Sequence, residues 1–456
     1  MRAEPSPGAV ESALAAQSTV AERFVAPLRR MTRTASAGGM VLLACAALAM
    51  AWANSPWEHS YRALWETELT LGLGSLSARL ALHHVINDGL MAVFFFLVGL
   101  EIKREILVGE LATPRRAALP VAAAVGGMVV PALLFTLVNL GGEGTRGWGI
   151  PMATDIAFAL GVLALLGSRV PSSLRVLLSA LAIADDLGAV LVIALFYTAA
   201  VSWGAMAAAG GLLVLSIGAN AAGVRAAWVY ALIGMALWVA VLLSGVNATV
   251  AGVLLALTIP SRTRVDEAAF LRGARAALGD FHDARDPELT VLSSRAHQAA
   301  LRRLETLTEQ AQAPLARLEH GLHAVVTFGI MPLFALANAG VSLRAGGEML
   351  TSPVTVGVLV GLLLGKPLGI TVASWGAVRS GLATLPTGVT WRTLHGVAWL
   401  GGIGFTMSLF IAGLAFGAYP ALLTAAKLGI LLASVLAGLV GWALLRRTGV
   451  RRSASP

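Results

Sequence analysis

Two adjacent carboxylates, Asp185 and Asp186, lie in the middle of an apolar stretch that runs from about 172 to 199. A stretch of this length is enough for one helix to cross the hydrocarbon core of a bilayer. Adjacent residues on a helix point about 100° apart, so one carboxylate can face a fixed cation while the other faces a water-filled cavity. Two acids this close cannot both ionise easily, and we expect them to bind and release protons as a coupled pair. Residues 187–196 stay apolar beyond the pair, which argues against the alternative that the pair lies at a membrane surface.

A lysine, Lys366, lies in the middle of another apolar stretch, at about 353–377. The chain has 33 basic residues, of which only Lys103, Lys366 and Lys427 are lysines. Arginine keeps its proton in proteins, whereas a desolvated lysine can titrate in a useful range. Two interpretations of Lys366 stay open: a proton carrier and a structural counter-ion to the carboxylates. Lys427 lies near the start of the last apolar stretch, where we expect its side chain to reach back to the membrane surface.

Two apolar stretches contain polar or glycine-rich segments that predict a break in the helix. Pro151, Thr154 and Asp155 lie early in the fourth stretch, and residues 401–408 (GGIGFTMS) lie in the eleventh. Interrupted helices at matching places in two halves of a chain indicate a transporter built from inverted repeats, here spans 3–5 and 10–12. Asp155 can offset the positive ends of the broken helices and Lys366 the negative ends. A glycine-rich run is also compatible with simple close packing of helices.

The overall composition defines the class of protein in which these residues act. Of the 456 residues, 57% are hydrophobic and 12% are charged, whereas soluble domains are about 45–50% apolar and about 25% charged. This excludes a soluble enzyme of this length, since too little polar surface exists to cover it. It also excludes a disordered chain, which needs high charge. We therefore expect an all-α polytopic membrane protein, surrounded by the lipid bilayer.

The charge balance and the cysteine content exclude further classes of function. The net charge is +9, but the basic residues lie between apolar stretches, where they orient helices. We therefore expect no nucleic-acid partner. The single cysteine, Cys45, lies in an apolar stretch and allows no disulfide or cysteine metal site within the chain. We expect no cofactor.

The apolar stretches predict about twelve transmembrane helices, most of them near the ~20 residues that a bilayer core requires. We interpret the first as a retained helix and not as a cleaved signal peptide, because a long leader precedes it. The expected spans run at about 36–53, 81–102, 117–140, 149–167, 172–199, 202–220, 225–243, 245–260, 321–343, 353–377, 393–417 and 421–445.

The distribution of lysine and arginine predicts the orientation of these helices. The segments on the side of the N-terminus hold 27 of these residues and the opposite loops hold 4, which places both chain ends in the cytoplasm. Leaving out the long loop gives 18 against 4. The expected organisation is a cytoplasmic leader at 1–35, helices 1–8 within 36–260, a charged cytoplasmic loop at 261–320, helices 9–12 within 321–447 and a cytoplasmic tail at 448–456.

Two connecting segments have patterns of their own. Residues 66–80 alternate weakly around two glycines, which predicts a small extracytoplasmic β-hairpin. Residues 261–320 are charged and contain Ala/Leu/Arg stretches such as 270–278. They predict either a cytoplasmic helical insert or a disordered loop.

The second predicted helix carries charged residues at both ends. Asp88 follows an asparagine near its start, where it acts either as a helix cap or as part of a polar funnel. Glu101, Lys103, Arg104 and Glu105 close the same helix on the cytoplasmic side. They form either a solvated helix end or a functional cluster.

Six ordered segments resemble NhaA-type bacterial sodium/proton antiporters, and the resemblance covers about 36–447. They are 86–105 (INDGLMAVFFFLVGLEIKRE), 153–161 (ATDIAFALG), 182–188 (AIADDLG), 332–343 (PLFALANAGVSL), 365–369 (GKPLG) and 402–410 (GIGFTMSLF). The resemblance implies electrogenic exchange of cytoplasmic sodium (or lithium) for protons, two protons per sodium, by alternating access in a bacterial inner membrane.

The resemblance also implies roles for the membrane-embedded residues. Asp186, Asp185 and Thr154 would form the sodium site. Asp185 would pair with Lys366 when the site is empty or protonated. Asp155 and Lys366 would balance the ends of two crossed, broken helices.

Further roles are implied outside this central group. Gly402, Gly404 and Thr406 would form the broken backbone of the second interrupted helix, and Asp88 would line the outer part of the ion pathway. The hairpin at 66–80 would serve a homodimer contact. A cytoplasmic pH-sensing cluster would consist of Glu101, Arg104, Glu105, Glu319, His320 and His323.

One position departs from the family pattern. Asn247 stands where the family leads us to expect histidine, the side chain that switches near neutral pH. This leaves the pH range of activation open, as well as the sodium/lithium preference.

Two other classes of function would also place charges in a membrane. A sodium-coupled symporter of organic anions should have an anion-binding arginine or a Ser/Asn-rich cavity, and neither is evident. An intramembrane aspartyl protease takes its two aspartates from separate helices, and the sequence Gly-x-Gly-Asp does not occur. We therefore expect a transporter and not an enzyme.

Overall fold

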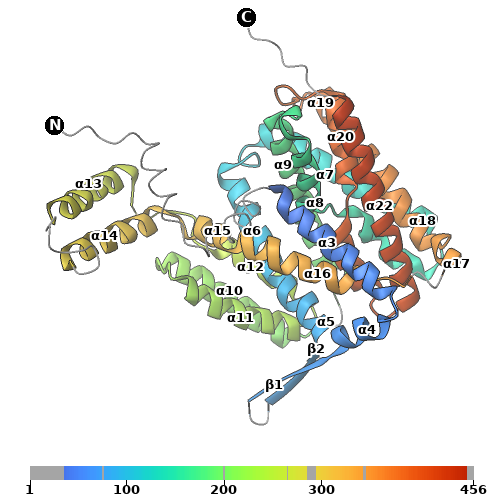
Figure 1. Ribbon diagram of the computed structural model, residues 1–456, viewed down its shortest axis with the longest axis horizontal. Coiled ribbons are helices and arrows are strands. Elements are labelled where there is room, and N and C mark those ends of the chain that lie inside the picture. The colour runs from blue at the N-terminus through green and yellow to red at the C-terminus, as the bar shows by residue number, and fades with distance from the viewer. Residues whose placement is uncertain are drawn as a thin grey trace, which may run out of the picture.

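The computed structural model describes residues 35–73, 76–198, 201–263, 265–284, 294–342 and 346–448, most of which form helices (Figure 1). The expected leader and tail lie almost entirely outside these residues. Within them, seven helical stretches are long and apolar enough to cross a membrane. Three bent pairs of helices raise the number to at most ten. The chain is therefore a helical, multi-pass membrane protein.

The seven long stretches include three that are interrupted by a π-helical turn. Such turns often occur at functional sites, and here η1 contains Asp88 and η6 directly precedes Lys366. The uninterrupted stretches are α7 (Pro114–Val138), α9 (Ser172–Phe196), α10 (Trp203–Ala221) and α22 (Pro420–Arg447). The interrupted ones are α5 (Leu82–His84), η1 (Val85–Leu90) and α6 (Met91–Val108); α15 (Pro314–Val325), η4 (Val326–Ile330) and α16 (Met331–Asn338); and α18 (Pro353–Val360), η6 (Gly361–Gly365) and α19 (Lys366–Arg379).

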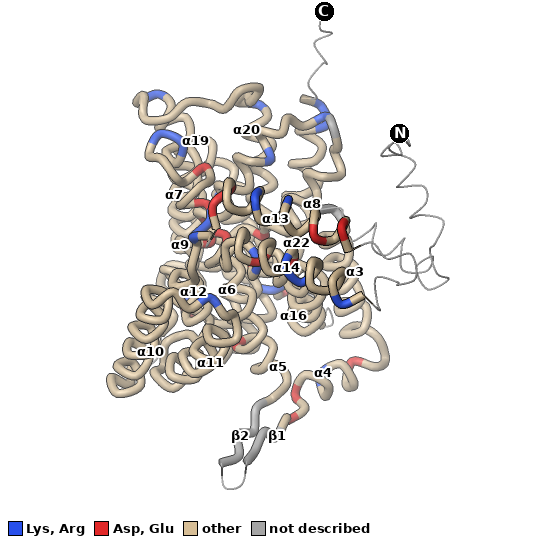
Figure 2. The backbone as a smooth tube through the Cα atoms, turned by 90° about the vertical axis from the view of Figure 1, so that its left-hand side faces the viewer, with Lys and Arg blue, Asp and Glu red and all other residues tan. Residues whose placement is uncertain are grey.

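The remaining elements are shorter or bent. α3 (Ala35–Ala53) turns by 115° into α4 (Glu58–Glu66). The apolar helices α11 (Ala227–Leu243) and α12 (Thr249–Thr258) lie where the seventh and eighth spans are predicted. Figure 2 shows α10 and α11 without blue or red along their length, as befits helices that face lipid. The short elements η3 (Gly167–Arg169) and α17 (Gly346–Leu350) complete the connections.

Two spans are broken near their middle, as the sequence predicts. η2 (Glu143–Met152) and α8 (Ile156–Leu165) meet at 46°, and α20 (Trp391–Gly401) and α21 (Phe405–Phe416) meet at 43°. η2 is a 3₁₀ helix of ten residues, which is long for that type. The second break requires glycine at 402, because a Cβ there would lie 2.5 Å from the carbonyl oxygen of Leu362.

Glycines bring α7 and α19 into close contact. A Cβ at Gly126 would overlap the carbonyl oxygen of Gly369, and a Cβ at Gly369 would overlap that of Gly126. Small residues let membrane helices approach closely enough for extensive dispersion contact. This contact holds α19, which begins at Lys366, firmly against α7.

A small hairpin projects from the bundle at the foot of Figure 1. Strand β1 (Glu68–Leu73) pairs with β2 (Leu76–Ala81) in antiparallel register, from Glu68↔Ala81 to Leu73↔Leu76. Strands therefore occur where the sequence predicts a hairpin at 66–80.

The charged segment 261–320 contains two helices, α13 (Glu267–Asp283) and α14 (Arg295–Ala311), which pack against each other (Figure 1). The rings of Phe281 and His297 lie 4.6 Å apart between them, and Arg303 pairs with Asp280 at 2.9 Å. Of the two alternatives left open by the sequence, the described residues support the helical one. The next helix, α15, begins at Pro314 and not at the expected 321, because proline is well suited to the first turn of a helix.

Candidate functional site

Lys366 and Asp185 form an ion pair in the centre of the bundle. The distance from Lys366 Nζ to Asp185 Oδ2 is 2.7 Å, and both side chains are fully buried. Lys366 Nζ also donates a hydrogen bond to the carbonyl oxygen of Met152, the last residue of η2. The C-terminal end of a helix carries partial negative charge, so the ammonium group balances both a carboxylate and a helix end.

Asp186 points away from this pair and lines a cavity of about 800 Å³ that Asp185 and Lys366 do not line. This is the arrangement that the 100° separation on α9 predicts. In the structure, Asp185 Oδ1 and Asp186 Oδ1 are both buried without a hydrogen-bond partner. Two unpaired carboxylate oxygens on neighbouring residues are suited to a hard cation, which prefers oxygen ligands.

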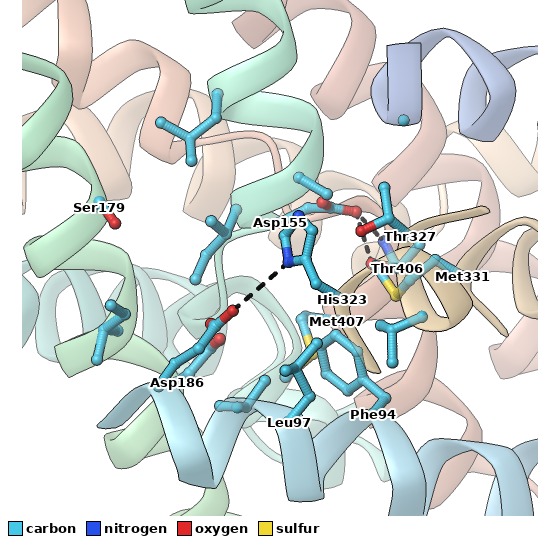
Figure 3. Close-up of a pocket in the computed structure, with 18 of the residues that line it drawn as sticks. Phe94, Leu97, Asp155, Ser179, Asp186, His323, Thr327, Met331, Thr406 and Met407 are labelled. Atoms are coloured by element: carbon cyan, nitrogen blue, oxygen red, sulfur yellow. Dashed lines mark hydrogen bonds and ion pairs between the residues drawn. The ribbon is translucent and has the colours of Figure 1, made fainter. Parts of the chain in front are cut away.

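The cavity is bounded by both broken helices and by α6, α9 and α15 (Figure 3). Figure 3 shows Asp155, Asp186, Thr406 and His323 around the same space. Thr154 also lines it, next to the break between η2 and α8. The cavity thus brings together side chains that are far apart in the sequence.

Asp155 joins the two helix breaks. Its Oδ1 accepts a hydrogen bond from the Phe158 amide at 2.9 Å and caps α8. Its Oδ2 accepts from the Thr406 amide at 3.2 Å and from the Thr406 hydroxyl at 2.5 Å, at the start of α21. One carboxylate therefore faces the positive ends of two helices, which is the electrostatically favourable placement.

Backbone contacts also link the breaks. The Asp155 amide donates to the Ile403 carbonyl at 2.7 Å, and the Thr154 hydroxyl donates to the Gly401 carbonyl at 2.8 Å. The Thr154 oxygen keeps lone pairs for a cation after donating its proton. The crossing therefore satisfies orphan backbone groups of both breaks without water.

Four of the six residues in the predicted cytoplasmic cluster line the cavity. Arg104 pairs with the buried carboxylate of Glu319, and His323 Nδ1 lies 4.0 Å from Glu101 Oε1. These pairs connect α6 with α15. The ionisable groups at this end therefore line the same cavity as Asp186.

The other two residues of the predicted cluster point elsewhere. Glu105 accepts a hydrogen bond from the Glu110 amide at 2.8 Å, where the chain turns after α6. His320 is exposed, and its Nδ1 lies 2.9 Å from the carbonyl oxygen of Ala316 on its own helix. Neither residue lines the cavity.

Asp88 and Asn247 lie outside the cavity. Asp88 is half-buried in η1, and its backbone carbonyl accepts a hydrogen bond from the Trp238 indole at 3.1 Å. Asn247 Oδ1 accepts from the amide of Thr249 at 3.0 Å and from its hydroxyl at 2.5 Å. Asn247 thus orders the start of α12.

Some residues of the site are not evident from the sequence. Ser408 donates to the Ile150 carbonyl at 2.7 Å and fixes α21 against η2. Ser179 lines the cavity, and its position two turns before Asp186 on α9 would have indicated a shared face. No local pattern identifies the Met152 carbonyl, because a backbone acceptor has no side-chain signature.

Comparison with known proteins supports the resemblance seen in the sequence. The pattern of a protein family described as Na+/H+ antiporter 1 matches residues 29–445. A protein of Oleidesulfovibrio alaskensis named Na(+)/H(+) antiporter NhaA is 51% identical over 93% of this chain and 94% of its own length. Similar proteins of the same name from Koribacter versatilis and Acidithiobacillus ferrooxidans are each 50% identical, over 95% and 92% of this chain and 94% and 96% of their own lengths.

Proposed function

This chain belongs to the NhaA family of Na+/H+ antiporters, and from that premise we propose that it exports sodium from the cytoplasm in exchange for external protons. Sodium is the transported substrate, and lithium is an alternative one. The bacterial inner membrane is the proposed location. No observation favours the anion symporter or the intramembrane protease.

The ion site in this proposal consists of Asp186, Asp185 and Thr154. The observation that carries it is the division of the carboxylate pair: Asp186 faces the cavity while Asp185 is held by Lys366. A sodium ion that enters along the cavity reaches Asp186 first. It can then draw on Asp185 and on the Thr154 oxygen at the helix break.

Protons and sodium compete for the same carboxylates in this mechanism. When the site is protonated, the ion pair between Asp185 and Lys366 is intact, as in the structure. Sodium adds one positive charge beside Lys366, which weakens that pair and drives protons from the site. With two protons exchanged for one sodium, each cycle moves one charge, and a potential of 100 mV contributes about 2.3 kcal/mol per cycle.

The crossed breaks are the element that reorients. We assign the repeats to α7–α9 and to α18–α22, with twelve spans and both termini in the cytoplasm. The similar bends of 46° and 43° and the contact between Asp155 and Ile403 support this assignment. A small movement of one break against the other would change the side of the membrane from which the ion site is accessible. A small movement suffices because Asp155 and Lys366 balance the charges of the opposed helix ends.

The residues at the cytoplasmic end of the cavity are proposed to sense pH. Glu101, Arg104, Glu319 and His323 couple α6 to α15 through two pairs whose strength depends on protonation. Asn247 supplies no titratable group. We therefore assign control of the pH range of activation to these four residues at the cytoplasmic end of the cavity.

The hairpin of β1 and β2 is proposed as a contact in a homodimer. Each strand of a two-stranded sheet leaves one edge of backbone groups unpaired. A second copy can satisfy these edges by pairing strand to strand. Cysteine cross-linking between copies at Glu68 would test this contact.

Proton release from the purified protein tests the ion site. Adding sodium to detergent-solubilised protein in weakly buffered solution should release protons in a saturable manner. Asp186→Asn should abolish the release, whereas Asp280→Asn on the exposed α13 should not change it. Release that persists in Asp186→Asn would contradict the proposed site.

A further inference from the structure

A second cavity, of about 460 Å³, lies between α6, α11, α12 and α15, outside the ion site. Its floor is formed by buried residues of α12, among them Ala251, Gly252 and Leu255. It falls within the volume range of sites that bind small ligands. Nothing in the proposed exchange mechanism uses this cavity.

Helix α6 forms a shared wall between the two cavities. Leu97 and Glu101 line the ion cavity, whereas Val93 and Phe96 line the second cavity. At about 100° per residue, the two sets are centred on adjoining sides of the same helix. A change in what fills one cavity therefore acts on the wall of the other.

Helix α15 has the same double role. Glu319 and His323 line the ion cavity, whereas Leu318 and Leu322 line the second cavity. These are the helices that the Arg104–Glu319 pair connects. The second cavity thus lies directly behind the pair that joins α6 to α15.

The lining of the second cavity is apolar. None of the described residues that line it is charged, and its only N–H or O–H side chains are Tyr230 and Trp238. The Tyr230 hydroxyl donates to the Val224 carbonyl at 2.9 Å, and the Trp238 indole donates to the Asp88 carbonyl at 3.1 Å. Buried water needs two to four polar partners, and these side chains have no donor left for it.

The mouth of the cavity follows α11. Its lining residues on that helix recur at helical spacing from Ala227 to Trp238, a stripe of about 16 Å. Met235 lines the mouth and is 63% exposed, and the neighbouring Leu232 is 64% exposed. In a membrane-spanning bundle this apolar surface faces hydrocarbon chains.

We propose that this cavity binds one acyl chain of a membrane phospholipid, which supports α6 and α15 from the side opposite the ion. The length of the stripe suits an extended hydrocarbon chain, and the described lining offers no charged group and no free side-chain donor to a polar occupant. The bilayer supplies such chains at the mouth in great excess. The chain lies along α11 and reaches the floor at Leu255.

A photoreactive lipid tests the proposal with the full-length protein. The protein is reconstituted in nanodiscs that contain a phospholipid with a diazirine near the end of one acyl chain. After irradiation, the labelled residues are mapped by mass spectrometry. We expect labels on the buried Leu255 and the partly buried Phe96, in addition to labels on exposed side chains such as Val214 of α10.

Two substitutions that fill the cavity provide the comparison. A Cβ at Gly89 would meet no atom within 4 Å, so Gly89→Leu extends into free space, and Ala231→Phe fills the mouth from α11. Both should remove most labelling of Leu255 and leave labelling of Val214 unchanged. Gly210→Leu is the matched control, because Gly210 is exposed on α10 and a Cβ there also meets nothing within 4 Å.

The Tm of thermal unfolding supplies a second readout, which is needed if one of the filling variants folds poorly. Removing lipid with detergent should lower the Tm of the unmodified protein more than that of Gly89→Leu, whose leucine replaces part of the chain. If Leu255 and Phe96 stay unlabelled in the unmodified protein, the proposal is wrong. It is also wrong if the filling variants do not reduce the labelling of Leu255. Cross-links between Leu255 and a second copy would also overturn it. None of these readouts measures exchange, so they do not depend on the proposed transport function.

Discussion

Lys366 Nζ lies 2.7 Å from Asp185 Oδ2, with neither side chain exposed. Removing one member of such a pair leaves the other charge buried without compensation, which typically costs 3–5 kcal/mol. We expect Lys366→Met to lower the free energy of unfolding by about this amount. Arg303→Met breaks the exposed pair with Asp280 and should cost only about 0–1 kcal/mol.

A double variant separates the effect of leaving one charge unpaired from the effect of the changed packing at position 366. Asp185→Asn combined with Lys366→Met removes both charges, and it should recover much of the lost stability. Thermal unfolding in the same detergent measures the stability of four proteins: the unmodified protein, Lys366→Met, Arg303→Met and the double variant. Equal destabilisation by the Lys366 and Arg303 substitutions would show that the buried pair contributes no more to stability than the exposed pair.

Replacing Lys366 by arginine tests whether the lysine carries a proton. Arginine preserves the charge but cannot be deprotonated in proteins. We expect Lys366→Arg to lose electrogenic sodium/proton exchange, measured as current on a solid-supported membrane across a range of pH. A retained electrogenic current would assign Lys366 the role of a fixed counter-ion.

Competition for the carboxylates predicts a steep pH dependence of sodium affinity. A lower proton concentration leaves more of the site unprotonated, so the apparent KM for sodium should fall as pH rises. Each competing proton contributes up to about tenfold per pH unit on the acid side, so the two protons of the proposed cycle together allow up to about a hundredfold. Initial rates of exchange at fixed pH on both sides of proteoliposomes measure it. An apparent KM that is constant over two pH units would rule out competition.

The contact between Gly126 and Gly369 predicts a position-specific effect on α19. Gly369→Ala places a methyl group against the Gly126 backbone, and overpacking of this kind costs about 1–3 kcal/mol. Gly376→Ala on the same helix meets no atom within 4 Å and should be neutral or stabilising by up to about 1 kcal/mol. The two Tm values should therefore move in opposite directions or differ clearly. Similar values would contradict the close approach of α7 and α19.

Much of the central site could be predicted from the sequence because its signals are local. Two acids on one helix must point about 100° apart, and the structure has Asp185 on Lys366 and Asp186 on the cavity. The helix breaks follow from Pro151 and from the glycines after position 400. Their contact requires only that two interrupted spans cross.

The parts that the sequence did not indicate depend on packing between distant segments. The Met152 carbonyl becomes a partner of Lys366 only through the meeting of η2 and α19. Glu319 and His323 are four residues apart and share a helix face, whereas His320 follows Glu319 directly and points about 100° away. The family resemblance groups all three, but the helical geometry separates His320. The apolar cavity behind α6 has no motif, because small apolar residues are common in every span.

The most direct test of the account is sodium-dependent proton flux in proteoliposomes with Asp186→Asn. Asparagine keeps the size of the side chain but neither binds a proton in this range nor supplies a negative charge to sodium. We expect Asp186→Asn to fold, with a Tm near that of the unmodified protein, and to show no sodium-dependent proton flux. The control Asp280→Asn should retain the flux. Normal flux in Asp186→Asn would show that the exchanged ions do not bind at this carboxylate.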